Sequence, residues 1–283
     1  MITPETLSGF RNWFSGYVKG FQSQDPEYQE GIRVKEAHTK RVCQEILDIG
    51  GSLGLDEADL RLAQVVALFH DIGRFEQYHR YGTYLDARSE DHALLGVAVL
   101  RKSGILDHLG PATRDLILRT TAYHNRPCLP EGESERILLF TKLLRDADKL
   151  DIWRVVTEYY RQEKGARYGA VGLGLPDTPE ISHGVWEDLM SGRTVRLGSL
   201  KTLNDFKLLQ MAWIYDVNFP RSFQRIQERG YLESLVQVLP PSKKVEQVYS
   251  RVKSYLSDRA GQGLTRRPLG PKAAAGSPSP RSR

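Results

Sequence analysis

The sequence has little cysteine and no long apolar run. Its 283 residues include two cysteines, Cys43 and Cys128, and neither belongs to a CxxC pair. A disulfide framework and a cysteine zinc site are therefore not expected, and reduced thiols fit a cytosolic protein. No apolar run approaches the roughly 20 residues that span a bilayer, and the first ten residues lack the basic start and apolar core of a signal peptide. We expect a cytoplasmic protein without a membrane segment.

Basic residues are in excess, but the excess is confined to one end of the chain. The formal net charge is +5, and 27% of the residues are charged. Six Lys or Arg and one acidic residue lie between Ser257 and Arg283, so the rest of the chain has no net charge. This end is also rich in Gly, Pro, Ala and Ser, which is typical of disorder. We expect residues 258–283 to form a disordered basic tail, and we do not expect a nucleic-acid partner.

Alternating strand patterns are also scarce, whereas apolar residues recur at helical spacing, which predicts a nearly all-α fold. We expect an N-terminal helix and loop (1–31), a helical domain (32–165) and a C-terminal helical extension (166–257). The extension either covers the helical domain or forms a homodimer surface, and the sequence leaves both open. The expected local elements are a loop at 22–31, helices at 32–49, 56–71, 90–103, 111–124 and 134–164, a loop or lid at 76–89 and a loop at 165–179.

One short stretch, Val65 to Phe75, combines apolar and reactive residues. An apolar run ends in the adjacent pair His70 and Asp71, and Gly73 follows. We interpret the run as the buried end of a helix that Gly73 stops in the left-handed conformation. A buried imidazole and carboxylate need a partner, because an unpaired buried charge is costly. A metal ion would satisfy both.

Further polar residues lie on apolar helices, and together they follow the order H…HD…H…H…D. Helical bundles build metal sites from such side chains on facing helices. Imidazole and carboxylate donors without thiolate suit Mn, Fe, Zn, Ni or Co, with Mg at a weaker position. Asp71 is the expected bridging ligand, because a carboxylate can bridge two ions. The set comprises His38, His70, Asp71, His92, His124 and an aspartate of the segment from Leu144 to Asp151.

This pattern resembles the HD-domain superfamily of metal-dependent phosphohydrolases, in the variant with two extra histidines, across residues 32 to 152. The stretch from His70 to Tyr84 is also similar to stand-alone bacterial-type HD proteins, a likeness that implies a fold but no substrate. By resemblance, the aspartate of the element Ala147-Asp148-Lys149-Leu150 is the last ligand. Asp146 remains an alternative, because it lies only two residues away.

The resemblance implies two divalent ions, one held by His38, His70, Asp71 and Asp148. Asp71, His92 and His124 would hold the second, and a water activated between the ions would attack phosphorus. His92 and His124 could instead contact a substrate phosphate. Asp71, Arg74 and Lys149 are the expected catalytic residues, and the two cations, with Arg126 as a further candidate, would neutralise the substrate. Lys149 could alternatively pair with Asp146 or Asp151, and Arg74 could form a structural salt bridge.

The expected function is therefore hydrolysis of a small phosphoester, either a phosphomonoester or a phosphodiester such as a nucleotide. The Gly-Tyr-Pro motif of cyclic di-GMP phosphodiesterases is absent after His124, where Asn125-Arg126-Pro127 follows. Two alternatives remain. The same ligand set resembles that of di-iron HD oxygenases, and a non-catalytic, signal-binding HD domain is the third interpretation. Fold alone does not decide among them.

Overall fold

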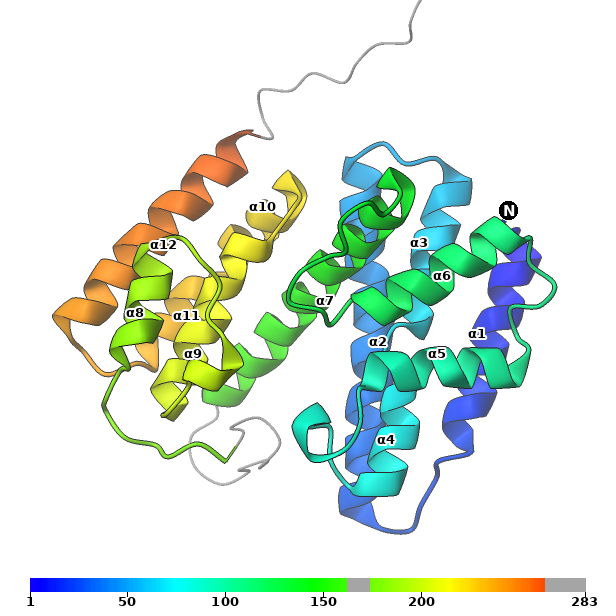
Figure 1. The fold of residues 1–283 in the computed structure, drawn as a ribbon, viewed down its shortest axis with the longest axis horizontal. Helices are drawn as coiled ribbons and strands as arrows, with labels where there is room; N and C mark the ends of the chain where they lie inside the picture. The colour runs from blue at the N-terminus through cyan, green and yellow to red at the C-terminus, as the bar shows by residue number, and fades with distance from the viewer. Residues whose placement is uncertain (162–173, 263–283) are drawn as a thin grey trace, which may run out of the picture.

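The computed structural model describes residues 1–161 and 174–262, and within these ranges the chain forms α-helices and short 3₁₀ turns without a strand. The predicted all-α fold is confirmed. Figure 1 shows α7 between two groups of helices. The N-terminal bundle consists of α1 (Pro4–Lys19), α2 (Pro26–Ser52), α3 (Glu57–Phe69), α4 (Gly73–Tyr81), α5 (His92–Ser103), α6 (Pro111–Tyr123) and α7 (Glu135–Arg161). The C-terminal helices are α8 (His183–Met190), α9 (Leu203–Ala212), α10 (Pro220–Glu228), α11 (Tyr231–Gln237) and α12 (Lys243–Gln262).

Helix α3 lies at the centre of the bundle, packed against α1, α2, α6 and α7. Asp56 caps its start by accepting a backbone N–H of the first turn. The residues from Val65 to Phe69 are buried. Transferring one such apolar side chain from water contributes about 1.5–3 kcal/mol. Because the helix ends at Phe69, His70 and Asp71 follow inside the bundle, as the sequence pattern predicts.

Helix α2 extends beyond both predicted ends. The side chain of Asp25 accepts two backbone N–H groups of the first turn, and Pro26 occupies the first helical position. Residues 26–31, predicted as loop, are therefore helical, since an Asp-Pro pair is a good helix start. The helix also continues through Gly50 and Gly51, where the sequence predicts its end. Packing of α2 along α3 and α7 offsets the poor helix propensity of these glycines.

The role predicted for Gly73 is wrong. It does not stop a helix in the left-handed conformation but begins α4. A Cβ at this position would lie 2.2 Å from the His92 carbonyl oxygen and 2.5 Å from the Gly96 nitrogen. Glycine is therefore required for the close approach of α4 to α5. The predicted loop at 76–89 is also wrong in its first half, because α4 extends to Tyr81.

The later elements lie close to the predicted ranges. Asp91 caps α5, and Pro111 begins α6 as predicted. Residues 258–262 of the predicted tail belong to α12, whereas 263–283 lie outside the described residues. The end predicted for α7 at Lys164 and most of the predicted loop 165–179 lie outside them too. None of the helices in the described ranges has the length and apolar character needed to cross a bilayer.

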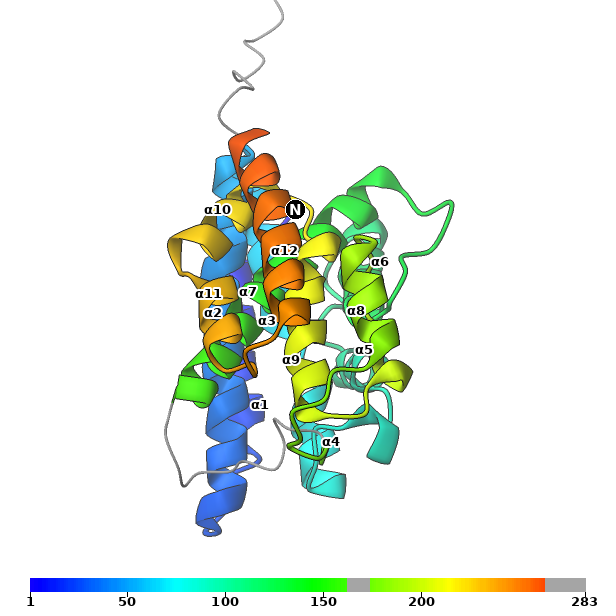
Figure 2. The same cartoon turned by 90° about the vertical axis from the view of Figure 1, so that its left-hand side faces the viewer.

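The C-terminal helices pack on α7 and on the end of α2. Helices α10 and α11 contact α7, and α10 also contacts α2. On α2, Asp48 pairs with Arg221 and Arg225, each at 2.8 Å. Trp153 of α7 is fully buried and donates its indole N–H to the Gln210 carbonyl. Figure 2 shows α12 in front of the C-terminal helices, and it packs against α8, α10 and α11.

We predict that Gly73→Ala lowers the free energy of unfolding by about 3 kcal/mol, because the new methyl group overlaps the α5 backbone. Gly16→Ala is the matched control, since a Cβ on this exposed helical glycine meets nothing within 4 Å. The control should gain up to about 1 kcal/mol from helix propensity. Urea denaturation measures both changes, and equal stability of the two variants would contradict the close-approach argument.

Candidate metal centre

Two of the histidines follow the last turn of a helix and are oriented by that turn. His70 follows α3 and donates Nδ1–H to the Ala67 carbonyl at 2.7 Å. His124 follows α6 and donates Nδ1–H to the Thr121 carbonyl, also at 2.7 Å. We assign the tautomers from these acceptors. In both rings Nε2 is left as a lone-pair donor that faces the bundle interior.

The other two histidines are held by carboxylates from distant positions. His38 on α2 has Nδ1 2.7 Å from Asp151 Oδ2 of α7, and Arg41 also pairs with Asp151. His92, the first residue of α5, has Nδ1 2.7 Å from Asp86 Oδ2. Such carboxylate–histidine pairs fix ring orientation and raise the basicity of the other nitrogen. The sequence analysis missed Asp86 and Asp151 in this role.

The Nε2 atoms form two pairs, with the Asp71 carboxylate between them. His38 and His70 have their Nε2 atoms 3.3 Å apart, and those of His92 and His124 are 3.0 Å apart. Asp71 Oδ2 lies 3.6 and 3.7 Å from the first pair. Asp71 Oδ1 lies 3.4 and 3.7 Å from the second. Each carboxylate oxygen therefore faces a different histidine pair, an arrangement suited to bridging.

The structure brings Asp148, and not Asp146, to these donors. Asp148 Oδ1 lies 3.1 Å from His38 Nε2 and 3.8 Å from His70 Nε2. Asp146 faces the C-terminal helices, where its carboxylate accepts the backbone N–H groups of Asn218 and Phe219 at 3.0 Å. The two aspartates lie on different faces of α7, so Asp148 faces the histidines and Asp146 faces the C-terminal helices.

The charge states of the donors suit a divalent cation. Burial lowers the pKa of His70 and of His92 to about 4, so both rings are neutral at pH 7. Burial acts to raise the pKa of Asp71, but Lys35, His70 and other nearby groups hold it well below its usual value. Neutral imidazole nitrogens and an ionised carboxylate thus converge in a buried space, and a divalent cation would satisfy them together.

The pKa of His38 shifts in the opposite direction to the pKa values of His70 and His92. Burial and Lys35 act to lower its pKa, but hydrogen bonds to Asp148 and Asp151 raise it above the usual value overall. A cation at Nε2 would require that nitrogen to be unprotonated, as metal binding to protein donors generally does. The donor set thus fits a metal on both sides of Asp71.

Two cations flank Asp71. Lys35, one turn before His38 on α2, has its Nζ 2.9 Å from Asp71 Oδ2 and a side chain that is 19% exposed. Arg74 has its Nε 3.6 Å from Asp71 Oδ1. Its NH1 group donates to Asp86 and to the Tyr84 carbonyl, which fixes the segment that holds His92. The sequence analysis missed Lys35, although the spacing of three residues from His38 places it on the same helix face.

The remaining predicted cations lie elsewhere. Lys149 Nζ pairs with Asp216 of the C-terminal region at 2.7 Å, and not with Asp146 or Asp151. Arg126 is exposed, and its guanidinium lies over the Tyr123 ring. Arg126 therefore shows no contact with the metal donors.

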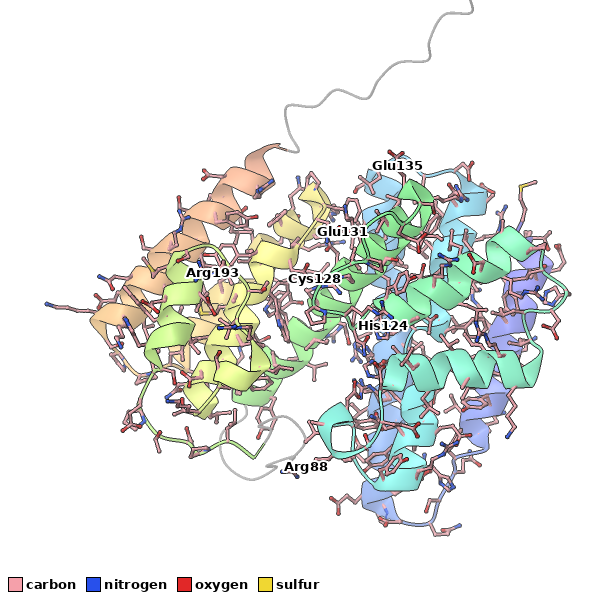
Figure 3. The ribbon with its side chains drawn as sticks, viewed as in Figure 1. Arg88, His124, Cys128, Glu131, Glu135 and Arg193 are labelled. Carbon is pink, nitrogen blue, oxygen red and sulfur yellow. The ribbon has the colours of Figure 1, made fainter. Side chains whose placement is uncertain are left out.

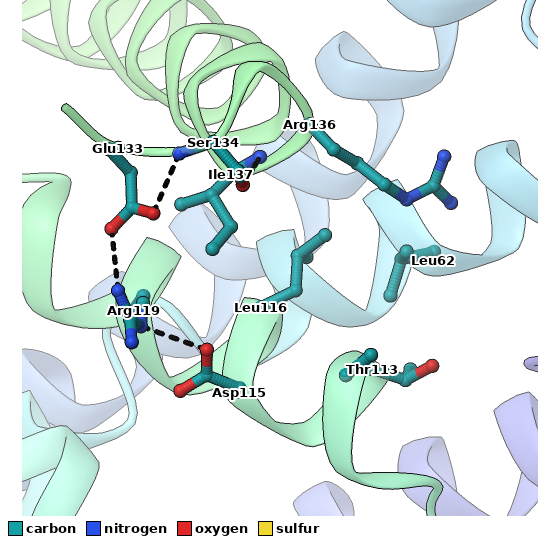
Figure 4. A pocket seen from close by; sticks show the side chains of 10 residues that line it. Leu62, Thr113, Asp115, Leu116, Arg119, Glu133, Ser134, Arg136 and Ile137 are labelled. Atoms are coloured by element: carbon teal, nitrogen blue, oxygen red, sulfur yellow. Dashed lines mark hydrogen bonds and ion pairs between the residues drawn. The ribbon is translucent and has the colours of Figure 1, made fainter.

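A surface pocket of about 370 Å³ lies between α3, α6 and α7 (Figure 4). Leu62 and Leu116 contribute to its apolar lining. At its rim, Arg119 pairs with Asp115 and with Glu133, each at 2.9 Å. These charges satisfy one another at the surface. The converging buried donors are the stronger candidate site.

We predict that Asp151→Asn lowers metal affinity by about 10- to 100-fold, because the charged partner that orients His38 is lost. Titration against a chromogenic chelator measures this change. Glu158→Gln, on the same helix, is the control, because Glu158 forms an exposed pair with Arg154. Unchanged affinity in Asp151→Asn would mean that His38 is not a ligand held by this contact.

The region that holds this centre matches the model of a known protein family. The model of the HD domain family matches residues 36–153, which lie within the predicted domain 32–165. No curated protein and no solved structure matches the chain significantly. The matched region contains the adjacent His70 and Asp71 and every donor described above. Residues 36–153 are therefore similar to the HD domain family, whose members are typically metal-dependent hydrolases.

Proposed function

We propose that this protein is a metal-dependent phosphohydrolase that uses two divalent ions to cleave a small phosphoester. The observation that carries the proposal is the position of Asp71, whose two oxygens face two separate histidine pairs. His38, His70, Asp71 and Asp148 would hold one ion, and Asp71, His92 and His124 the other. A lone His-Asp pair in a structural role would not account for this second set of donors.

The ions themselves would lower the pKa of a bound water and polarise the phosphoryl oxygens. Nitrogen and oxygen donors suit Mn, Fe, Zn, Ni or Co, and Mg more weakly. The chain contributes the orientation of the donors. The Nδ1 hydrogen bonds of the four imidazoles hold the ring planes before substrate arrives, so little reorganisation accompanies the reaction.

The position of Lys35 favours a substrate with negative charge. Its ammonium group reaches the buried donors, yet the side chain remains partly exposed. The Asp71 carboxylate that Lys35 neutralises would share its charge with bound ions, which leaves Lys35 free to bind a phosphoryl oxygen. Arg74 would act mainly by holding Asp86 and, through it, His92. Lys149 is paired with Asp216 and is not assigned to substrate binding here.

The first test combines metal analysis of the purified protein with a phosphatase screen. The panel contains p-nitrophenyl phosphate, bis-p-nitrophenyl phosphate and nucleotides, each with Mn²⁺ and Mg²⁺. We predict two ions per chain and a loss of at least about 100-fold in phosphate release in Asp71→Asn. Asp59→Asn, which alters a surface pair with Arg136, should retain activity. Two bound irons with oxygen-dependent turnover and no phosphatase activity would contradict the proposal in favour of an oxygenase.

A second prediction concerns Lys35. Lys35→Met should lower kcat/KM by about 100-fold while two ions remain bound, because it removes a cation that stabilises charge on the phosphoryl group. Lys40→Met on the same helix is the control, because Lys40 forms an exposed pair with Glu36. Steady-state kinetics and metal analysis provide the two readouts. A full loss of metal from Lys35→Met would show that this residue supports the donors rather than the substrate.

A further inference from the structure

Arg145 joins the end of α6 to the C-terminal helices. Its NH1 group donates to the carbonyl oxygen of His124 at 3.1 Å and to that of Arg126. Its NH2 group pairs with Asp216 Oδ2 at 2.5 Å. Figure 3 shows His124 at the end of α6. Arg145 therefore contacts the main chain of a metal-donor residue on one side and a carboxylate outside the bundle on the other.

These contacts restrain the position of His124. The last carbonyls of a helix have no partner within the helix, and a cation near them is favourable. Arg145 supplies both the donor and the charge where α6 ends. Its side chain is only 7% exposed, so its charge depends on a counter-ion. Asp216 provides that counter-ion.

The segment that carries Asp216 is itself anchored to α7. Asp146, adjacent to Arg145, accepts the backbone N–H groups of Asn218 and Phe219 and the Asn218 side-chain amide at 2.9 Å. Asp146 is fully buried. Lys149 adds a second cation to Asp216. The C-terminal segment is thus held with its carboxylate facing Arg145.

The donors of the other ion are held from within the bundle. His38 is oriented by Asp151 of α7, and His70 by the Ala67 carbonyl of its own helix. We propose that Asp216 is a positioning residue for the second ion, acting through Arg145 on His124. The C-terminal helices would then complete the metal centre rather than merely adjoin it. This inference rests on the two-ion centre proposed above.

Single-ion variants separate this role from a general structural one. His38→Ala weakens the first site, and His92→Ala weakens the second. Asp216→Asn is added to each, and both proteins are titrated with Co²⁺ alone, followed by visible absorption and by competition with a chelator. We expect at least about a tenfold loss of affinity in the His38→Ala background. In the His92→Ala background we expect less than about a threefold change, because no ion there depends on His124.

Two further variants serve as controls. Asp48→Asn breaks the pairs with Arg221 and Arg225 at another junction of the bundle and the C-terminal helices, and it should leave both affinities unchanged. Asp216→Glu, which keeps the carboxylate, should restore part of the lost affinity. Circular dichroism confirms that each variant is folded.

If the wild-type protein binds two ions, Asp216→Asn could still lower Co²⁺ affinity equally in the two backgrounds, or in neither. Either result would overturn the role of Asp216. A wild-type protein that binds fewer than two ions would instead contradict the proposed two-ion function, and this inference with it. The two failures are therefore distinguishable by the stoichiometry of the wild-type protein.

Discussion

The convergence of imidazole nitrogens on one buried carboxylate is the constraint on which the candidate metal centre depends. Asp71 lies between two histidine pairs, and Lys35 and Arg74 compensate part of its charge. Such a cluster is unfavourable in a protein core unless each polar atom has a partner. The Nδ1 atoms find theirs within the protein. The Nε2 atoms and the Asp71 oxygens are arranged for cations.

The four rings are oriented by two different kinds of contact. His70 and His124 each bond to the carbonyl three residues earlier, so the last turn of a helix orients its own donor. His38 and His92 instead depend on carboxylates. Asp151 reaches His38 from another helix, whereas Asp86 belongs to the segment between α4 and α5. The centre therefore combines local geometry, which any well-formed helix end provides, with contacts that exist only when the bundle is packed.

Helix α7 carries residues that contact the histidines and residues that contact the C-terminal segment. Asp148 and Asp151 face the histidines, Asp146 faces the segment that leads into α10, and Arg145 contacts both the His124 carbonyl and Asp216. A shift of the C-terminal helices would first change the contacts of Asp146. One helix therefore contacts both the histidines and the C-terminal segment.

The sequence by itself determined the all-α fold, the likeness of residues 36–153 to the HD domain and the order of the candidate donors. Caps such as Asp56 and starts such as Pro111 act within one turn, so they can be recognised from neighbouring residues. The roles of the six donors remain predictions, although the structure places them together.

Tertiary structure alone decided what depends on the approach of distant helices. It placed Asp148, and not Asp146, beside the histidines. It showed which residues contact the donors from the side, namely Lys35, Asp86 and Asp151. It also paired Lys149 with Asp216. It also showed that Gly73 is needed for contact between α4 and α5 rather than for ending a helix. Helical periodicity defines the face on which a side chain lies. Which other helix meets that face is set by packing, and no local pattern encodes it.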